Sequence, residues 1–238
     1  MLDYDGTLAP FRPERDLAVP YPGIEERLER LIASETTRVI IVSGRAIDDL
    51  KPLLKLNKLP EIWGSHGWER LDAAGQYRLG RVDPEPAAGL KKARELVTVN
   101  NLEQYLEVKP VSLAIHRRDV AEDKVVEIER IIVDNWDRLA DEYDLVLDNF
   151  DGGWELKVPG STKGDVVGRI LGEHSSDTPA AYLGDDLTDE DAFRALPPTA
   201  LGILVRTEPR PSAASVHITP PVELLEFLDR WINLERRT

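Results

Sequence analysis

Two aspartates separated by one residue, Asp3 and Asp5, lie just ahead of a Gly6-Thr7 turn at the start of the chain. Residues i and i+2 of a strand point to the same side, so both carboxylates can reach one pocket where a strand ends. Gly6 lets the chain turn sharply at that point. Such a pair can serve as nucleophile and acid/base, or can hold a cation. A plain turn with solvated carboxylates fits the same residues, so the pair alone leaves both interpretations open.

An acidic run over residues 184–191, Gly-Asp-Asp-Leu-Thr-Asp-Glu-Asp, is the strongest chemical signal in the sequence. Its five carboxylates repel one another unless a cation neutralises some of them. Helix capping accounts for one or two, because Asp and Glu favour a first helical turn. It does not readily account for Asp185 and Asp186, which directly follow a strand-like segment. Hard oxygen ligands indicate Mg²⁺ or a similar ion, and the alternative is a solvated helix start.

Ser43 and Lys163 are two further candidates, and each has a plain structural alternative. Ser43 and Gly44 follow an apolar run, where a hydroxyl and backbone N–H groups can hold a phosphate oxygen. Ser43 can equally cap the helix that follows. Lys163 opens a predicted helix, which is the unfavourable end of the helix dipole for a cation. Functional sites tolerate such costs, and the alternative is a solvated surface lysine.

Buried strands and amphipathic helices alternate towards the two ends of the chain, which is the α/β pattern. Val39-Ile40-Ile41-Val42 is a continuous apolar run, typical of a strand buried on both faces in a parallel sheet. The predicted strands are 39–42, 180–183 and 201–205, and the predicted helices are 23–34, 46–54, 162–171, 189–196 and 222–234. The chemical signals then fall where a parallel sheet places its active site, at the carboxyl ends of strands.

The middle of the chain has a different pattern, and we expect it to form a separate domain. The sequence predicts helices over 90–97 and 120–140, and strands over 104–108, 111–115, 145–147 and 154–158. Paired strands next to helices indicate a small α+β unit with an antiparallel sheet. We therefore predict an α/β core in two segments, 1–81 and 153–238, with an inserted α+β domain over 82–152.

The composition narrows the class of protein. The chain has 238 residues and a net charge of −14, which argues against a nucleic-acid or anionic membrane surface as partner. It has no cysteine, so disulfides, thiolate zinc sites and thiol nucleophiles are excluded. No apolar stretch approaches the ~18 residues that span a bilayer. No signal peptide fits ahead of the aspartate motif, so we expect a cytoplasmic, monomeric protein.

The four motifs together resemble those of the haloacid dehalogenase phosphatase superfamily. They are Asp3-x-Asp5-Gly6-Thr7, Val42-Ser43-Gly44-Arg45, Lys163-Gly164 and the run from Gly184 to Asp191. Longer strings at residues 2–10, 64–67 and 184–193 are similar to the trehalose-6-phosphate phosphatase branch. The resemblance implies a Rossmann-like parallel-sheet core with an inserted α+β cap domain. Relatives usually carry several apolar residues before the first aspartate, whereas only Met1 and Leu2 precede Asp3 here, so the central first strand is expected to be very short.

The resemblance also implies a role for each residue. Asp3 would attack phosphorus and form an aspartyl-phosphate, while Asp5 would protonate the leaving sugar oxygen and then activate water. The phosphoryl oxygens would be bound by Ser43, Gly44 and Lys163. The implied cofactor is Mg²⁺, with Asp3, the backbone carbonyl of Asp5, Asp185 and Asp189 as the metal-binding residues.

In the inserted domain the resemblance is looser and concerns the sugar. The positions that resemble sugar-contacting residues of the trehalose-phosphate branch are Glu107, Lys109, His116, Arg118 and Glu155. Polar groups of this kind suit the recognition of hydroxyl groups, and the domain would close over the sugar and exclude water. An ordinary solvated strand end explains Arg118 equally well.

These observations predict a Mg²⁺-dependent phosphatase that hydrolyses trehalose 6-phosphate to trehalose and phosphate. The expected partner is a small-molecule sugar phosphate, with no nucleic acid and no membrane. One alternative is the same chemistry on sucrose phosphate, mannosyl-phosphoglycerate or glucosylglycerol phosphate. Another is a non-catalytic sugar-phosphate sensor, against which the intact set of Asp3, Asp5, Ser43, Lys163 and Asp185 argues.

Overall fold

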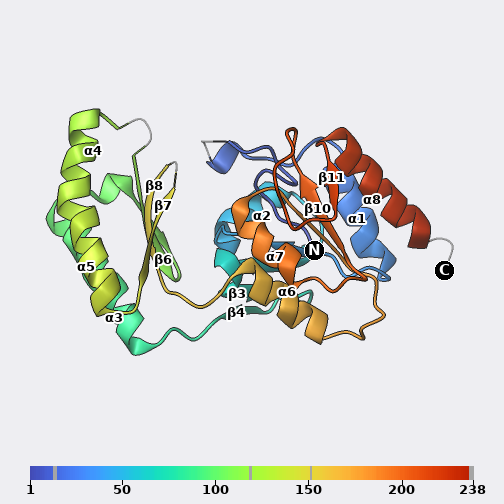
Figure 1. The fold of residues 1–238 in the computed structure, drawn as a ribbon, viewed down its shortest axis with the longest axis horizontal. Coiled ribbons are helices and arrows are strands. Elements are labelled where there is room, and N and C mark those ends of the chain that lie inside the picture. Colours follow the sequence, from blue (N-terminus) through green and yellow to red (C-terminus); the bar gives the residue numbers. More distant parts are fainter. Residues whose placement is uncertain (13–14, 118–119, 151, 236–238) are drawn as a thin grey trace. The chain divides into compact units, whose positions relative to one another are not determined.

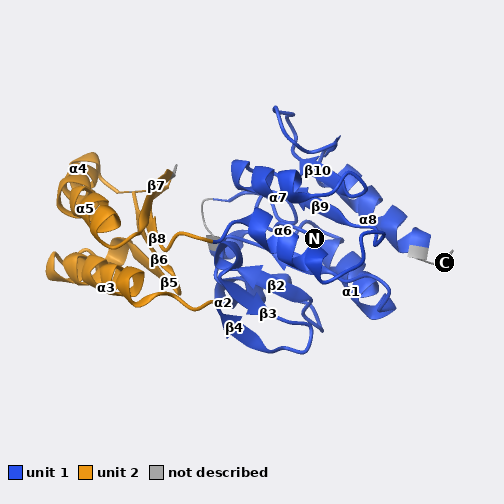
Figure 2. Ribbon diagram, turned by 60° about the horizontal axis from the view of Figure 1, so that its bottom comes forward, with its two compact units in different colours: residues 1–79, 161–238 blue, residues 80–160 orange. Residues whose placement is uncertain are grey.

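The computed structural model describes residues 1–12, 15–117, 120–150 and 152–235, and the chain divides into two compact units (Figure 2). Unit 1 is Met1–Leu79 with Ser161–Thr238, and unit 2 is Gly80–Gly160. Unit 2 includes β8 (Gly153–Lys157), because this strand pairs with β6 (Ser112–His116) and β7 (Val146–Phe150). This pairing corrects the predicted end of the inserted domain from residue 152 to Gly160.

A mostly parallel sheet forms the centre of unit 1. Its parallel pairs are β1 (Ile40–Val42) with β2 (Glu61–Gly64), and β10 (Leu201–Val205) with both β9 (Ala181–Gly184) and β11 (Val216–Ile218). At one edge, β3 (Glu69–Leu71) and β4 (Tyr77–Leu79) continue from β2 in antiparallel pairs. The strand orders are β1-β2-β3-β4 and β11-β10-β9. The strands β2, β3 and β4 were not predicted from the sequence.

Residues 1–3 connect these two parts of the sheet, because they lie between β1 and β9. Leu2 forms parallel bridges with Ile41 on one side and Leu183 on the other. Its N–H donates to the carbonyl of Ile40 at 2.8 Å, and the Asp3 N–H donates to the carbonyl of Leu183 at 2.9 Å. The central strand is therefore as short as the sequence predicts, and hydrogen bonds to both neighbours hold it in place.

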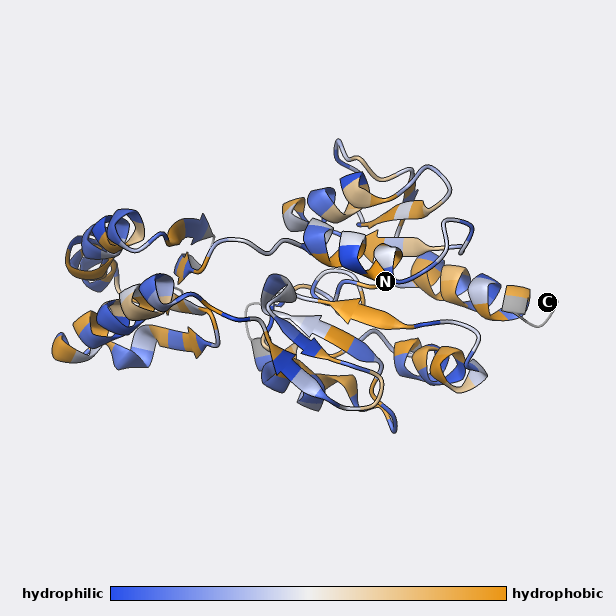
Figure 3. Ribbon diagram, turned by 90° about the horizontal axis from the view of Figure 1, so that it is seen from below, coloured by the Kyte–Doolittle hydropathy of each residue, from blue (hydrophilic) through white to orange (hydrophobic). Residues whose placement is uncertain are grey.

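Helices cover both faces of this sheet. On one face, Ile40 and Val42 pack with residues of α6 (Lys163–Gly172) and α7 (Glu190–Ala195). On the other, Ile41 packs with residues of α1 (Ile24–Ser34), α2 (Ile47–Leu54) and α8 (Val222–Glu235). Neighbouring residues of a strand point to opposite faces, so the continuous apolar run at 39–42 is buried on both sides. Each helix carries hydrophilic as well as hydrophobic residues (Figure 3), as surface helices do.

Unit 2 is an antiparallel sheet with helices along one side (Figure 1). Its strand order is β5-β6-β8-β7, with β5 at Leu106–Lys109. The helices are α3 (Pro84–Val99), α4 (Glu122–Ile128) and α5 (Asp134–Glu142). A π-helical turn, η4 (Glu129–Val133), joins α4 to α5, so the helix predicted over 120–140 contains one wider turn. Among the described residues, no helix has the length and apolar composition to cross a membrane.

Candidate active site

Three predicted site residues follow neighbouring segments of the unit 1 sheet. Asp3 follows the central bridge at Leu2, Ser43 follows β1, and Asp185 follows β9. Since the carboxyl ends of parallel strands share one edge, the sheet brings these residues to the same place. Lys163, the first residue of α6, reaches the same place from the helix side, with its Nζ 2.6 Å from Asp3 Oδ1.

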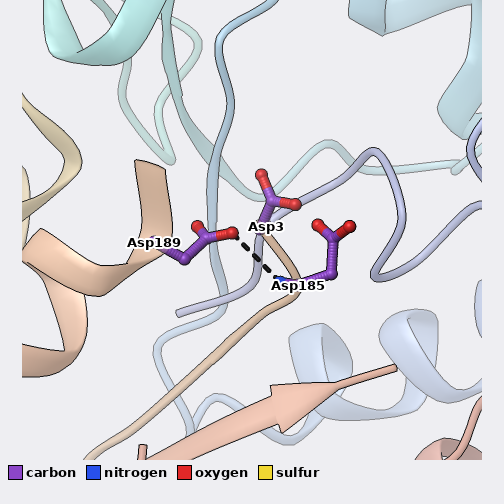
Figure 4. Close-up of side chains that lie close together, drawn as sticks. All are labelled: Asp3, Asp185 and Asp189. Atoms are coloured by element: carbon purple, nitrogen blue, oxygen red, sulfur yellow. Dashed lines mark hydrogen bonds between the residues drawn. The ribbon is translucent and has the colours of Figure 1, made fainter. Parts of the chain in front are cut away.

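Asp3, Asp185 and Asp189 form a compact group of carboxylates (Figure 4). One oxygen atom from each lies within 4.8 Å of the others, and Asp3 and Asp189 are buried. Asp189 Oδ2 accepts the backbone N–H groups of Asp185 and Asp186, both at 3.0 Å. Asp185 Oδ1 is buried and has no hydrogen-bond partner among the described residues. An unpartnered carboxylate oxygen beside two further carboxylates fits a hard divalent cation such as Mg²⁺.

Lys163 is a buried cation between two of these carboxylates. Its Nζ lies 2.6 Å from Asp3 Oδ1 and 2.7 Å from Asp189 Oδ1, and only 4% of its side chain is exposed. Tyr182 donates its hydroxyl to the same Asp189 oxygen at 2.6 Å. Thr7 donates its hydroxyl to Asp3 Oδ2 at 3.2 Å. The lysine therefore offsets part of the negative charge that the fold gathers here, and removing it would leave buried charge uncompensated.

Burial and mutual repulsion shift the protonation of this group. Burial and the charge on Asp189 raise the pKa of Asp3 well above its usual range, although Lys163 opposes the shift. Burial, followed by the charge on Asp189, raises the pKa of Asp185 to about 7. Burial lowers the pKa of the Lys163 ammonium, but Asp3 and Asp189 together raise it above its usual value. A cation bound among the carboxylates would favour their ionised forms.

Asp5 lies outside the group of three carboxylates, and its side chain is bound by Arg45. The guanidinium donates from Nε to Asp5 Oδ2 at 2.7 Å and from Nη2 to Oδ1 at 2.5 Å. Only 3% of the Arg45 side chain is exposed, against 31% for Asp5. Arg45 was not predicted as a site residue. The sequence feature that could have identified it is its position, because it is a charged residue directly after a buried strand and a Ser-Gly turn.

The Ser43-Gly44 turn rests on a second turn, residues 64–67. The Ser43 carbonyl accepts the His66 N–H at 3.0 Å, and the Arg45 carbonyl accepts the Ser65 N–H at 2.7 Å. Ser65 and His66 both have left-handed backbones, with φ of 47° and 56°, which non-glycine residues rarely adopt. A Cβ on Gly44 would lie 2.6 Å from the His66 ring, so glycine is what lets the ring pack on this turn. Strained backbone of this kind is typical of functional sites.

Gly6 allows the first aspartate motif to approach Asp185. Its φ is 79°, and a Cβ at this position would lie 2.0 Å from Asp185 Oδ2. Any other residue would therefore displace the carboxylate as well as strain the backbone. The close approach explains why glycine follows Asp5, and it links the first motif directly to the acidic run.

Four of the five predicted sugar-contacting residues share one face of the unit 2 sheet. The register puts Glu107 of β5 and Glu155 of β8 in one row, with a β6 residue between them. Glu155 Oε1 accepts from Lys109 Nζ at 2.7 Å, and His116 Nε2 lies 2.9 Å from Glu107 Oε2. Arg118, the fifth of these residues, lies outside the described residues. The face therefore presents an array of paired charged and polar groups.

Comparison with known proteins decides the family. A family model described as trehalose-phosphatase matches residues 1–219. The chain belongs to the trehalose-phosphatase family. All four motifs fall within the matched residues, and the resemblance drawn from them is confirmed.

Two relatives show how much of the chain is shared within this family. A bifunctional trehalose-6-phosphate synthase/phosphatase from Thermoproteus tenax is 33% identical over 224 residues, which cover 92% of this chain and 29% of that protein. A trehalose-phosphate phosphatase from Mycobacterium marinum is 29% identical over 247 residues, which cover 96% of this chain and 60% of that protein. The chain thus spans less than two thirds of the length of either relative.

A solved structure shows the same fold. A haloacid dehalogenase-like hydrolase from Bacteroides thetaiotaomicron superposes with a TM-score of 0.70 at 16% identity, covering 97% of each chain. This similarity extends over both units of the trehalose-phosphatase family member described here. The predicted fold class, an α/β core of the haloacid dehalogenase type with an inserted α+β segment, is therefore confirmed.

Proposed function

We propose that this trehalose-phosphatase family member hydrolyses trehalose 6-phosphate to trehalose and phosphate. The observation that carries the proposal is the buried group of Asp3, Lys163, Asp185 and Asp189 at the carboxyl edge of the sheet. The substrate is supported by the relatives, whose names state trehalose-6-phosphate or trehalose-phosphate as what they act on.

The proposed cofactor is Mg²⁺, held by Asp3, the backbone carbonyl of Asp5, and Asp185, with Asp189 in support. The Oδ1 of Asp185, which has no hydrogen-bond partner among the described residues, supports this assignment. A buried carboxylate oxygen without a donor is costly, and a bound cation would remove that cost. When bound, the ion would neutralise charge between the carboxylates and an incoming phosphate dianion.

The proposed chemistry assigns one bond change to each aspartate. Asp3 attacks phosphorus and forms an aspartyl-phosphate as the bond from phosphorus to the sugar oxygen breaks, and Asp5 gives its proton to that oxygen. Asp5 then takes a proton from water, whose oxygen attacks phosphorus, releasing phosphate and regenerating Asp3. The ion pair with Arg45 must open, or turn with the carboxylate, before Asp5 can reach the leaving group.

The remaining proposed roles concern binding. The Ser43 hydroxyl, the Gly44 N–H and the Lys163 ammonium bind phosphoryl oxygens, and their charge and dipoles stabilise the transition state. Unit 2 is the proposed sugar-recognition domain. Its face with Glu107, Lys109, His116 and Glu155 supports this role, because it offers donors and acceptors suited to hydroxyl groups.

The test of the proposed function is phosphate release from a panel of sugar phosphates. The panel contains trehalose 6-phosphate, sucrose 6-phosphate, mannosyl-3-phosphoglycerate, glucosylglycerol phosphate and glucose 6-phosphate, each with and without Mg²⁺. We expect kcat/KM for trehalose 6-phosphate to exceed that of every other substrate by at least about 100-fold, since sites built around substrate hydroxyls discriminate strongly. Equal turnover across the panel would overturn the substrate assignment. Binding of a sugar phosphate without turnover would favour the alternative of a non-catalytic sugar-phosphate sensor.

Magnesium is expected to stabilise the folded protein more at pH 8 than at pH 5. The pKa of Asp185 is raised from 3.8 to about 7 by burial and by Asp189. At a pH between these two pKa values, Asp185 carries a proton in the folded, metal-free protein but not in the unfolded chain. The free energy of unfolding therefore falls as pH rises through this interval. The ionised carboxylates formed at the higher pH are also the form that binds a cation.

We therefore expect about 10 mM Mg²⁺ to raise Tm by roughly 4 °C or more at pH 8 and by about 1 °C or less at pH 5. The measurement is thermal unfolding with Mg²⁺ and with a chelator at both pH values. Asp185→Asn serves as the control, because an amide does not ionise, and the gain at pH 8 should be largely lost. An equal gain at both pH values in the unaltered protein would contradict the prediction.

A further inference from the structure

Arg206 and Arg210 contact the loop that carries Asp185, on the side of its backbone carbonyls. Arg210 donates from Nη2 to the carbonyl of Asp186 at 2.8 Å and to that of Asp185 at 3.4 Å. Arg206 donates from Nη1 to the Asp185 carbonyl at 3.3 Å. Both arginines lie in the segment between β10 and β11, for which no site residue was predicted. Two guanidinium groups thus donate hydrogen bonds to the backbone of the acidic run.

Glu190 fixes Arg210 in this position. Its Oε1 accepts from Arg210 Nη1 and also from the Ser212 hydroxyl, the latter at 2.7 Å. Its Oε2 accepts the Ala213 N–H at 2.8 Å. Glu190 is buried, and these donors hold both of its carboxylate oxygens in place. This buried glutamate therefore ties the segment that carries Arg210 to the start of α7.

The Asp185 loop is consequently held from two sides by neighbouring residues of one short segment. Asp189 accepts the loop's N–H groups, and Glu190 binds the arginine that donates to the loop's carbonyls. The carboxylate of Asp185 has less support, because its Oδ1 lacks a hydrogen-bond partner in the described part of the chain. Repulsion from the Asp189 carboxylate also acts to drive it away. The direction of this carboxylate therefore depends on how its backbone is held.

We propose that Arg210 is a positioning residue for metal binding, which holds the Asp185 backbone so that the carboxylate faces Asp3 and Asp189. The proposal rests on the proposed Mg²⁺ site and concerns affinity for the ion, not the chemical step. Removing Arg210 takes charge-assisted hydrogen bonds from two carbonyls and leaves Glu190 without its cation. Groups that orient metal ligands in this way typically change metal affinity by about 10- to 100-fold.

The test uses Arg210→Ala and Arg210→Lys, with Arg194→Ala as the matched control. Arg194 also lies near Glu190, at 4.0 Å, but its side chain is 62% exposed. Among the residues described, it forms no hydrogen bond with the backbone carbonyl of Asp185 or Asp186. The Kd for Mg²⁺ is measured by titration calorimetry on the full chain without substrate. We expect it to rise about 10-fold or more in Arg210→Ala, less in Arg210→Lys, and under about 2-fold in Arg194→Ala.

Phosphate release at increasing Mg²⁺ supplies the second readout. We expect kcat of Arg210→Ala at saturating Mg²⁺ to stay within about 3-fold of the unaltered enzyme, because the ion refills a weakened site by mass action. An unchanged Kd would overturn the proposal, and so would a loss of kcat that saturating Mg²⁺ does not restore. If Arg210→Ala does not fold, as judged by circular dichroism, Glu190→Gln replaces it, and an unchanged Kd there likewise overturns the proposal.

Failure of the proposed function has a different signature. If the unaltered chain binds Mg²⁺, and Arg210→Ala weakens that binding, while no sugar phosphate is hydrolysed, the role of Arg210 is supported and the phosphatase proposal fails. If trehalose 6-phosphate is hydrolysed but Arg210→Ala binds Mg²⁺ normally, the reverse holds.

Discussion

Replacing Asp3 with asparagine is expected to lower phosphate release from trehalose 6-phosphate by about 10⁴-fold or more at saturating Mg²⁺, as loss of a nucleophile does. The amide has the shape of the carboxylate but neither its charge nor its nucleophilic oxygen. Asp3 is almost completely buried at the end of the central bridge, 2.6 Å from the Lys163 ammonium. No other described carboxylate occupies that position, so no neighbour can take over the attack on phosphorus.

The matched control is Asp191→Asn in the same acidic run. The Asp191 side chain is about half exposed and pairs with Arg194, itself an exposed residue. We expect its rate to stay within about 2-fold of the unaltered enzyme, because surface ion pairs contribute little. Rates are measured as phosphate release at saturating concentrations of trehalose 6-phosphate and Mg²⁺. A near-normal rate in Asp3→Asn would refute the nucleophile assignment, and an equal loss in Asp191→Asn would show that net charge, not position, governs activity.

Much of unit 1 was predictable because its signals are local. The β-branched run at 39–42 indicates a strand buried on both faces, and Ile40 and Ile41 indeed pack on opposite sides of the sheet. Repulsion among the carboxylates of the acidic run can likewise be predicted from the sequence alone, because these residues are neighbours along the chain. The meeting of Asp3 with Asp185 follows from topology, because alternating strands and helices force a parallel sheet whose carboxyl ends share one edge.

The unpredicted features depend on contacts between distant segments. A sequence shows an arginine at position 45 or 210, but it does not show that one meets a carboxylate at Asp5 and the other a carbonyl at Asp186. Similarly, β3 and β4 are three residues long and carry charged side chains, so they lack a strand's apolar alternation. The strand at 154–158 was predicted, but the end of the inserted domain was placed before it at residue 152, whereas the pairing of β8 with β6 and β7 assigns that strand to unit 2.

Replacing Lys163 with methionine is expected to destabilise the metal-free protein by about 3–5 kcal/mol at pH 8, because one partner of a buried ionic group is removed. Methionine keeps much of the lysine stem but leaves Asp3 and Asp189 without their shared cation. Activity is expected to fall by about 10²- to 10³-fold even at saturating Mg²⁺, as loss of one group that stabilises transition-state charge does. Urea unfolding and phosphate release supply the two measurements.

The pH dependence separates this cause from simple loss of packing. Burial and Asp189 already raise the pKa of Asp3, and removing the ammonium raises it further. The folded variant then binds protons that its unfolded chain does not, so its stability decreases as pH rises from about 5 to 8. The difference from the unaltered protein should therefore be larger at pH 8 than at pH 5, whereas a packing defect would be equal at both.

Two further variants test whether the Lys163 ammonium stabilises the fold by neutralising buried carboxylates. The double variant Lys163→Met with Asp189→Asn removes one of the two unpaired charges, and we expect it to be more stable at pH 8 than Lys163→Met alone. Lys51→Met is the surface control, since Lys51 forms a solvent-exposed pair with Asp48, and its effect should stay within about 0.5 kcal/mol. If Lys163→Met lost no more stability than Lys51→Met at pH 8, the buried ammonium would not be what holds these carboxylates together, because the fold would tolerate their repulsion without it.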